Sequence, residues 1–398
     1  MKALLLGAGA SYDCGFPLVT ELTPLFKSKA MKLLDKYPHH CNNQKICLII
    51  QNLFNTSMHY EAIVGYLEVL FNQTTDSSYK KDLYYTIGFF YQIIHYTLLE
   101  NYQIPQSEYC LKTLEAFRGI KHLLSDNHPL WIFSLNHDII VEMLSNLLNI
   151  NLKSGFFDAK PISFNSYQNK YTLLFEELTR CNINHNQFNF FRHNESGINL
   201  LKMHGSLDIF AYGDDTNYRK IKFEKNDPES GTKILKLIAE VNFEIVNKDK
   251  INCVNESVFF DEYGEIQFLR HSILSGAHKF SPKMQQIAPP EFLAQFKSNL
   301  NYIDELVCIG YGFGDQHINE IIEEWLSFND DNKLIIVNPY GEVPSFLIYL
   351  IPKISIIKKR TTDYFMSISE MYDDSSIKSV RPIIDVMNKS RDSAKRSY

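Results

Sequence analysis

The sequence lacks the segments that place a chain in or across a membrane. No stretch of about 18 uninterrupted apolar residues occurs, so we expect no membrane span. The first apolar run, Ala3 to Leu6, is short and ends in glycines, which differs from a secretory signal peptide. We therefore expect a cytoplasmic protein that does not bind membranes.

The cysteines lack the pairing that a disulfide framework or a structural zinc site requires. The chain has seven of them, an odd number, at wide spacings and without a Cys-x-x-Cys pair. This pattern predicts reduced thiols and argues against zinc of the paired-cysteine kind. The chain also lacks an excess of basic residues: the formal net charge is −6, which disfavours strong direct binding of nucleic acid.

Several catalytic signatures are missing as well. The sequence has no serine–histidine–acid order, no His-Glu-x-x-His and no Gly-x-x-x-x-Gly-Lys-Ser/Thr. Triad hydrolases, zinc proteases and P-loop ATPases therefore have no support.

What the sequence does contain is a series of short apolar runs separated by helical patterns. The runs predict strands at 2–6, 130–134, 199–203, 306–309 and 334–337, and helical spacing predicts helices at 139–148, 292–300 and 318–326 and over much of 25–125. Strands that alternate with helices indicate an α/β fold with a Rossmann-like, doubly wound parallel sheet. The block at 25–125 is then a helical insert, and the polar stretch at 366–398 is either a mobile tail or an interaction segment.

Each predicted strand ends in a polar or glycine-rich group. Because ligands of doubly wound sheets bind at the carboxyl ends of the strands, these groups should lie on one rim. They are Gly7-Ala8-Gly9, Asn136-His137-Asp138, His204-Gly205-Ser206, Gly310-Tyr311-Gly312 and Asn338.

The first group, Gly7 to Ser11, has the character of a phosphate-binding turn. Glycines let a backbone turn tightly and approach a phosphate. Tyr12 stands where the dinucleotide fingerprint requires its third glycine, and the acidic residue of that fingerprint has no clear counterpart. The motif favours a nucleotide site over a plain turn, but it gives little support to a dehydrogenase.

The other groups each allow a structural and a functional interpretation. Asp138 is either a helix cap or a site acid, whereas Asn136 can hold a ribose hydroxyl or orient a water molecule. His204 is either a structural histidine or a base that works near neutral pH. Asn338 fits either a turn before a proline or a ribose contact. Asp315 fits a helix cap best, and His317 faces either a pocket or the protein.

Taken together and in order, these motifs resemble the sirtuin-like domain in its prokaryotic NAD-hydrolase branch. The resemblance spans about residues 1–345. It is carried by Gly7–Ser11 with Gly15 and Pro17, Tyr60-Glu61, Asn136-His137-Asp138, His204-Gly205-Ser206, Gly310 to Phe313, Asp315 to Asn319, and Val337-Asn338. It implies a catalytic domain at 1–345 that binds NAD+, with its helical insert at about 25–125, followed by a C-terminal extension at 346–398.

The resemblance also implies roles for single residues. Asn136 and His204 would be catalytic, and Asp138 would lie near the nicotinamide. The remaining matches would bind the other parts of NAD+: Gly7, Ala8, Gly9 and Ser11 the pyrophosphate, Gly310 and Gly312 the phosphates, and Asn338 the adenosine ribose. No metal is implied, because the four-cysteine zinc site of the deacylase branch is missing.

The activity implied is an NAD+ glycohydrolase that releases nicotinamide and ADP-ribose, or its cyclic form, and depletes NAD+ in antiphage defence by abortive infection. The resemblance further implies a homo-oligomer with a partner protein such as a HerA-like ring ATPase. Alternatives that the residues leave open are an NAD-dependent protein deacylase, an ADP-ribosyltransferase and a non-enzymatic sensor of NAD+ or ADP-ribose.

Overall fold

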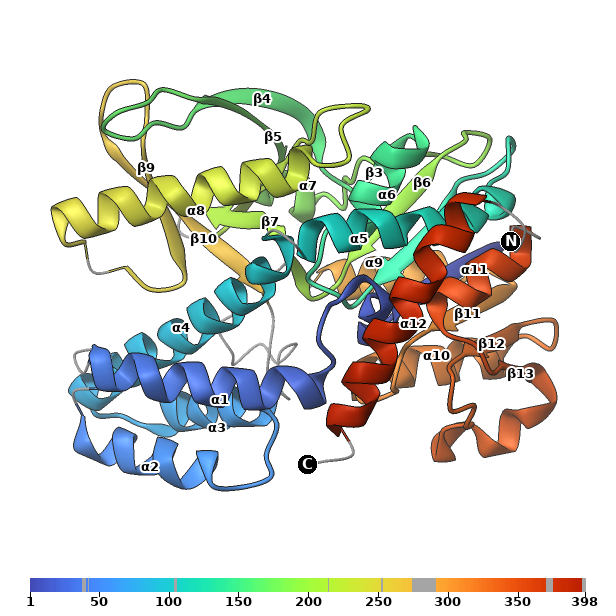
Figure 1. The fold of residues 1–398 in the computed structure, drawn as a ribbon, viewed down its shortest axis with the longest axis horizontal. Helices are drawn as coiled ribbons and strands as arrows, with labels where there is room; N and C mark the ends of the chain where they lie inside the picture. Colours follow the sequence, from blue (N-terminus) through green and yellow to red (C-terminus); the bar gives the residue numbers. More distant parts are fainter. Residues whose placement is uncertain are drawn as a thin grey trace.

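A seven-stranded parallel sheet forms the centre of the chain (Figure 1). The structure is a computed structural model and describes residues 1–37, 41, 43–103, 106–213, 215–251, 253–273, 291–369 and 375–395. The strands, in order across the sheet, are β13 (Ile354–Ile357), β12 (Lys333–Val337), β11 (Glu305–Ile309), β1 (Lys2–Leu6), β2 (Leu130–Ser134), β6 (Ile198–Lys202) and β3 (Leu152–Lys153). All the strands predicted from apolar runs are among them.

The chain reverses its direction of winding at β1. From β1 it moves through β2 to β6 on one side, and later through β11, β12 and β13 on the other. Leaving the short β3 aside, this is the 3-2-1-4-5-6 order of a doubly wound Rossmann sheet. The switch point lies between β1 and β11, where a ligand is expected at the carboxyl ends.

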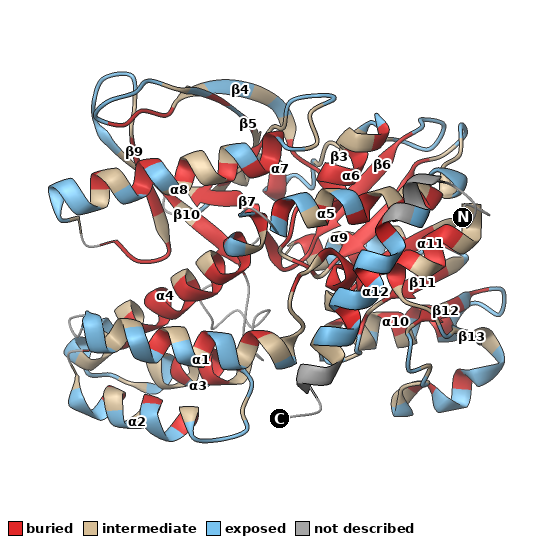
Figure 2. Cartoon of the chain, in the orientation of Figure 1, coloured by how far each residue is buried: buried red, intermediate tan, exposed pale blue. Residues whose placement is uncertain are grey.

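Both faces of the sheet are buried, which explains why its strands are apolar without alternation. In β1, Leu4 and Leu6 belong to one hydrophobic core, and Ala3 and Leu5 belong to another. The first core includes side chains of α6 (Ile140–Leu148) and α11 (Thr361–Ser369), and the second includes side chains of α9 (Glu291–Leu300) and α10 (Gln316–Phe328). Figure 2 shows the strands as the most buried part of the chain.

The described residues between β1 and β2 form helices and no strand. The apolar positions Ile63 and Leu67 of the predicted helical pattern are fully buried. The first helices of this insert, over residues 19–99, extend to the lower left of Figure 1, and the helix over residues 106–114 lies near the centre of the view. After two short 3-10 turns, η1 (Ala8–Ala10) and η2 (Tyr12–Cys14), the helices are α1 (Val19–Lys36), α2 (Gln44–Phe54), α3 (Tyr60–Gln73), α4 (Ser77–Leu99), η4 (Glu100–Tyr102), α5 (Gln106–Leu114) and η5 (Glu115–Leu123).

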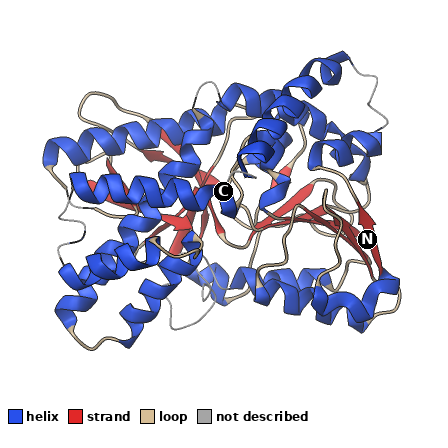
Figure 3. Cartoon of the chain, turned by 60° about the horizontal axis from the view of Figure 1, so that its bottom comes forward, coloured by secondary structure: helices blue, strands red, loops and turns tan. Residues whose placement is uncertain are grey.

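A second, six-stranded antiparallel sheet lies beside the first, and the sequence analysis did not predict it (Figure 3). Its strands carry charged residues at many positions, as in β4, so they give no apolar run. The helices α7 (Arg180–Asn184) and α8 (Ser230–Asp249) belong to this region. The strand order is β4 (Phe157–Ser163), β5 (Thr172–Leu178), β8 (Asn217–Ile221), β7 (Gly205–Tyr212), β10 (Ile266–Ile273) and β9 (Glu256–Phe260).

The C-terminal region is structured and contributes to the first sheet. Residues 345–353 form a 3-10 segment, η6 (Ser345–Lys353), and β13 then pairs with β12. The expected boundary at residue 345 therefore falls between two strands of one sheet. Within the described residues, α12 (Ser375–Lys395) is a helix that packs on the rest of the chain, which differs from a mobile tail.

No helix in the described ranges combines the length and the apolar character needed to cross a membrane.

Candidate active site

A cavity of about 570 Å³ opens at the carboxyl ends of the parallel strands. This volume lies within the range of about 300–1,000 Å³ that is usual for ligand pockets. The loops that follow β1, β2, β6, β11 and β12 all contribute to its wall, as expected from the topology. Every residue predicted for the site lines it: Gly7, Ala8, Gly9, Ser11, Asn136, Asp138, His204, Gly310, Gly312 and Asn338.

Three of the glycines allow the first and fourth of these loops to touch. Gly310 has φ +61°, and a Cβ there would lie 2.2 Å from the backbone nitrogen of Ala10. A Cβ on Gly7 or Gly9 would lie 2.5 Å or 2.8 Å from the backbone of the opposite loop. The close approach that the sequence analysis assigned to a phosphate is thus made between the two loops themselves.

Four of the five backbone amides of the first loop, Gly7 to Ser11, are already bonded within the protein. Such amides would otherwise be the donors of a phosphate cradle. Their acceptors lie in the same loop, in β11 or in the loop after it: Gly7 N donates to Ile309 O (3.0 Å), Gly9 N to Gly310 O (2.9 Å), Ala10 N to Gly7 O (2.8 Å) and Ser11 N to Ala8 O (3.3 Å).

The glycines that face open space are Gly312 and Gly314. No atom lies within 4 Å of a Cβ added at either position, and both residues line the cavity. Gly312 and Gly314 therefore leave room for a ligand beside the backbone, whereas Gly310 is packed against the first loop.

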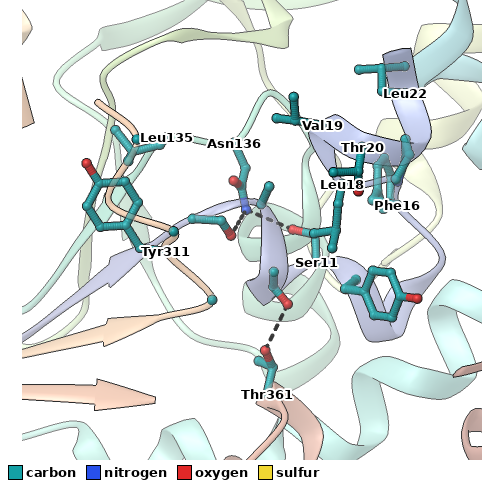
Figure 4. A pocket seen from close by; sticks show the side chains of 18 of the residues that line it. Ser11, Phe16, Leu18, Val19, Thr20, Leu22, Leu135, Asn136, Tyr311 and Thr361 are labelled. Atoms are coloured by element: carbon teal, nitrogen blue, oxygen red, sulfur yellow. Dashed lines mark hydrogen bonds between the residues drawn. The ribbon is translucent and has the colours of Figure 1, made fainter. Parts of the chain in front are cut away.

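Asn136 and Asp138 are joined through Ser11. The Asn136 Nδ2 donates to Ser11 Oγ (2.9 Å) and to Gly7 O (2.9 Å), and the Ser11 hydroxyl donates to Asp138 Oδ2 (2.5 Å). Figure 4 shows Asn136 pointing at Ser11 across the loop, with Thr361 bonded to the opposite side of that loop (Oγ1 to Gly9 O, 3.2 Å). Ser11 therefore fixes both polar side chains that follow β2.

The Asp138 carboxylate is bonded on both oxygens. Its Oδ1 accepts from Ile140 N at the start of α6 (3.1 Å), and its Oδ2 accepts from the Ser11 hydroxyl. Burial raises the pKa of the Asp138 carboxyl above its ordinary value, although the charge of Lys202 and the Ser11 bond oppose the rise. The Lys202 ammonium donates to the backbone oxygen of Asp138 and lies 3.4 Å from that of Asn136.

His204 stands where the chain passes from the first sheet to the second. It separates β6 from β7, and Gly205 makes the turn with φ +77°, where a Cβ would lie 1.9 Å from Ser272 O. His204 Nε2 lies 3.0 Å from Asp315 Oδ2, and each side chain is 7% exposed. The two side chains are thus placed to form an ion pair whenever the imidazole is protonated.

Asp315 differs from its expected role as a helix cap. It occupies the N-cap position of α10, but its side chain makes no capping bond there. The loop that carries Asp315 is bonded to Asn319 of α10. The Tyr311 hydroxyl donates to Asn319 Oδ1 (2.9 Å), and Asn319 Nδ2 donates to Phe313 O (2.8 Å). His317 is not among the described residues that line the cavity.

Asn338 forms the turn considered for it. Its Oδ1 accepts from Tyr340 N (2.9 Å), which is an Asx turn, and the residue still lines the cavity. Beside it, Lys359, Arg360 and Thr361 enter the wall from the segment after β13.

Sequence reasoning missed three contributors: Asp315 as a partner of His204, Lys202 behind Asp138, and Arg360 at the cavity wall. Lys202 gave a signal, because a lysine ends an otherwise apolar strand. Arg360 gave none, since β13 lies outside the predicted strands. Elsewhere in the wall, the helical insert supplies His59, Tyr60 and Glu61, of which Tyr60 and Glu61 carried the sequence resemblance.

The described residues contain no group of three or more histidine, cysteine, aspartate or glutamate side chains placed to hold a metal ion. The polar groups that meet in the cavity are instead the imidazole of His204 with the carboxylate of Asp315, the amide of Asn136 and the hydroxyl of Ser11. These groups can orient a ligand, accept a proton and position water.

Comparisons with known proteins give similarities to solved structures. No protein-family model matches the chain, and no curated protein sequence matches it. Among solved structures, the chain is similar to one described as the crystal structure of a Sir2 homolog–NAD complex. The two are 13% identical with a TM-score of 0.35, over 96% of this chain and 90% of that one.

Proposed function

We propose that this chain is an NAD+ glycohydrolase. The observation that carries the proposal is that Asn136, Asp138 and His204 come from two strand ends and line one cavity at the switch point of a Rossmann sheet. The motifs that resemble sirtuin-like NAD-hydrolases are thus the ones that surround the space available to a ligand.

Cleavage of NAD+ depends more on the orientation of the reacting groups than on a general acid. The nicotinamide of NAD+ leaves as a neutral group from a cation, so cleavage of its glycosidic bond needs no general acid. The protein must instead stabilise an oxocarbenium-like ribose and deliver water to it. Asn136 and Asp138, fixed through Ser11, would orient the ribose and the water.

His204 would accept the proton of that water or of a ribose hydroxyl. Its Nε2 faces the Asp315 carboxylate (3.0 Å), so Nδ1 is the ring nitrogen that would take the proton. General base catalysis of this kind contributes about 10²–10⁴-fold, or about 3–5 kcal/mol.

The biological setting is part of the same proposal. A glycohydrolase of this type would deplete NAD+ in the cytoplasm during antiphage defence, as a homo-oligomer controlled by a partner such as a HerA-like ring ATPase. The domain assignment, with a catalytic unit that contains a helical insert at about 25–125, belongs to this proposal too.

The test is nicotinamide release from NAD+, measured by chromatography with and without the partner. His204→Ala and Asn136→Ala should each lower release by at least about 10²-fold while the melting temperature stays close to wild type. His317→Ala is the matched control, because this histidine lies outside the cavity wall. Wild-type release by either site variant would refute the assignment. Acetyl-ADP-ribose or modified protein as the product would point to a transferase or deacylase, and binding without turnover would point to a sensor.

A further inference from the structure

The last turns of α12 are bonded to the segment that leads from the first cavity loop into α1. The Arg391 guanidinium donates to Tyr12 O (2.6 Å), Phe16 O (2.7 Å) and Glu21 Oε2 (2.7 Å). In Figure 1 this helix, in red, runs beside the blue segment before α1. The C-terminal helix is therefore positioned to influence the wall of the cavity.

Besides these backbone contacts, α12 bonds a cationic side chain of the cavity wall. Arg360 lines the cavity, and its Nη2 donates to Asp392 Oδ2 of α12 (2.5 Å). The guanidinium carbon lies 5.5 Å from the centre of the Tyr12 ring, and Nη1 lies 3.9 Å from Asp13 Oδ1. The Arg360 side chain is 26% exposed, so the pair is only partly buried.

Arg360 is one of two lysine or arginine residues among the described residues that line the cavity. The carboxylates among its described residues are Asp13, Glu61, Asp138 and Asp315, and the lysine and arginine residues are Lys359 and Arg360. A dinucleotide brings two negative phosphates into this wall. Since four of the five amides of the Gly7–Ser11 loop are bonded internally, a cationic side chain would be a further partner for these phosphates. An arginine offers a planar fork of donors that matches a phosphate.

We propose that Arg360 binds a phosphate of the dinucleotide, and that the Asp392 carboxylate occupies this guanidinium when no ligand is bound. The inference rests on the proposed function, because it assigns the phosphate end of the same substrate. Asp392 then stands in for the phosphate, and α12 makes an autoinhibitory contact. A ligand that must displace a competing carboxylate binds with a lower apparent affinity.

The experiment measures binding of ADP-ribose by calorimetry at low salt, which requires no turnover. Arg360→Ala should raise the Kd by about tenfold or more, because a hydrogen-bonded charge is lost. Asp392→Asn should lower the Kd about two- to fivefold, as expected for a partly exposed ion pair. Circular dichroism and melting temperature check that each variant folds.

Two controls separate competition from general loosening of α12. Arg381→Gln breaks another ion pair of the same helix, to Asp363 (3.3 Å), and should leave the Kd unchanged. In the Arg360→Ala background, Asp392→Asn should no longer have an effect. Tighter binding by Arg381→Gln, or a gain that persists without Arg360, would overturn the competition.

Two further outcomes would contradict the proposal directly. If Arg360→Ala binds ADP-ribose with unchanged affinity, Arg360 makes no contact with a phosphate. If Asp392→Asn binds ADP-ribose more weakly, Asp392 supports Arg360 instead of competing for it. ADP-ribose 2′-phosphate serves as a second ligand. An equal penalty in Arg360→Ala for both ligands supports a contact with the diphosphate. A penalty confined to the second ligand would place Arg360 at a 2′-phosphate and contradict the proposal for NAD+.

The proposal and the glycohydrolase assignment can fail separately. If the wild-type chain releases nicotinamide but Arg360→Ala binds ADP-ribose normally, only the phosphate assignment is wrong. If binding follows the expected pattern and no nicotinamide is released with the partner present, only the glycohydrolase assignment is wrong.

Discussion

At the scale of single residues, Asp315 changes what can be expected of His204. A lone histidine at a strand end can rotate between several hydrogen-bonding partners. Here the Asp315 carboxylate lies 3.0 Å from Nε2, and both side chains are almost fully buried. In the proposed mechanism, Asp315 acts as a positioning residue through His204, and no contact with the substrate is assigned to it.

Replacing Asp315 with asparagine tests this role. We expect kcat for nicotinamide release to fall by at least about tenfold, and by no more than the 10²–10⁴-fold that base catalysis contributes. KM and the Kd for ADP-ribose should stay near wild type, because the carboxylate orients the base and does not hold the ligand. Steady-state kinetics and calorimetry provide the check. A rise in KM with unchanged kcat would instead place Asp315 in ligand binding.

Residue types at strand ends were predictable from the sequence, but their partners were not. Asn136, Asp138 and His204 could be identified because each follows an apolar run that predicts a strand. Asp315 sits more than a hundred residues after His204, and no local pattern pairs them. Its position before a helix suggests a cap, and only the fold, which brings the loop after β11 to the loop after β6, places it beside the histidine.

At the scale of elements, the contact between the loops after β1 and β11 explains the glycine pattern better than ligand binding alone. Gly7, Gly9 and Gly310 hold the two backbones together, whereas Gly312 faces open space. Two glycines of one motif, separated by Tyr311, thus have different physical reasons to be glycine. The sequence does not distinguish them, because a motif shows spacing and not which backbone lies opposite.

Alanine substitutions should separate the two kinds of glycine. Gly310→Ala places a Cβ 2.2 Å from Ala10 N at φ +61° and should destabilise the fold by more than the roughly 1–2 kcal/mol of a left-handed residue. Gly312→Ala meets no atom within 4 Å and should fold normally, but should bind ADP-ribose more weakly if a ligand approaches there. Thermal melting and calorimetry measure the two effects. Gly310→Ala with a wild-type melting temperature would contradict the packing argument.

At the scale of the whole molecule, the five inner strands of the first sheet were predictable, whereas its two edge strands and the second sheet were not. The inner parallel strands are covered on both faces, so apolar composition alone reveals them. The outer strand β4 exposes charged side chains and gives no apolar run, and the buried β7 carries Asp208 among its apolar residues. Part of what joins the two sheets is also invisible in the sequence, because it consists of charges buried far from their partners in the chain.

Four charged side chains connect the two sheets behind Asp138. Lys202 ends β6 in the first sheet, Lys220 and Asp208 lie on β8 and β7 in the second, and Glu142 on α6 lies between them. Glu142 is 2.8 Å from Lys220 and 3.7 Å from Lys202, and Lys220 also pairs with Asp208. None of these side chains is more than 4% exposed.

Removing one charge from this network should destabilise the whole molecule. Glu142→Gln leaves buried lysines under-compensated and should cost on the order of 3–5 kcal/mol of unfolding free energy. A matched control is Glu324→Gln, which breaks an exposed pair with Lys297 and should cost less than about 1 kcal/mol. Denaturant unfolding measures both variants.

The same network predicts how stability depends on pH. Burial raises the pKa of Glu142, but the charges of Lys202 and Lys220 outweigh it and hold the pKa below its ordinary value of 4.5. A depressed carboxyl pKa means that the unfolded chain binds more protons, so this stabilisation is present above about pH 4.5 and is lost as the pH falls. Between pH 7 and pH 4 the wild-type chain should therefore lose stability more steeply than Glu142→Gln. Equal slopes in the two proteins would show that Glu142 carries no proton-linked stability, and that the two sheets are held together by apolar contacts alone.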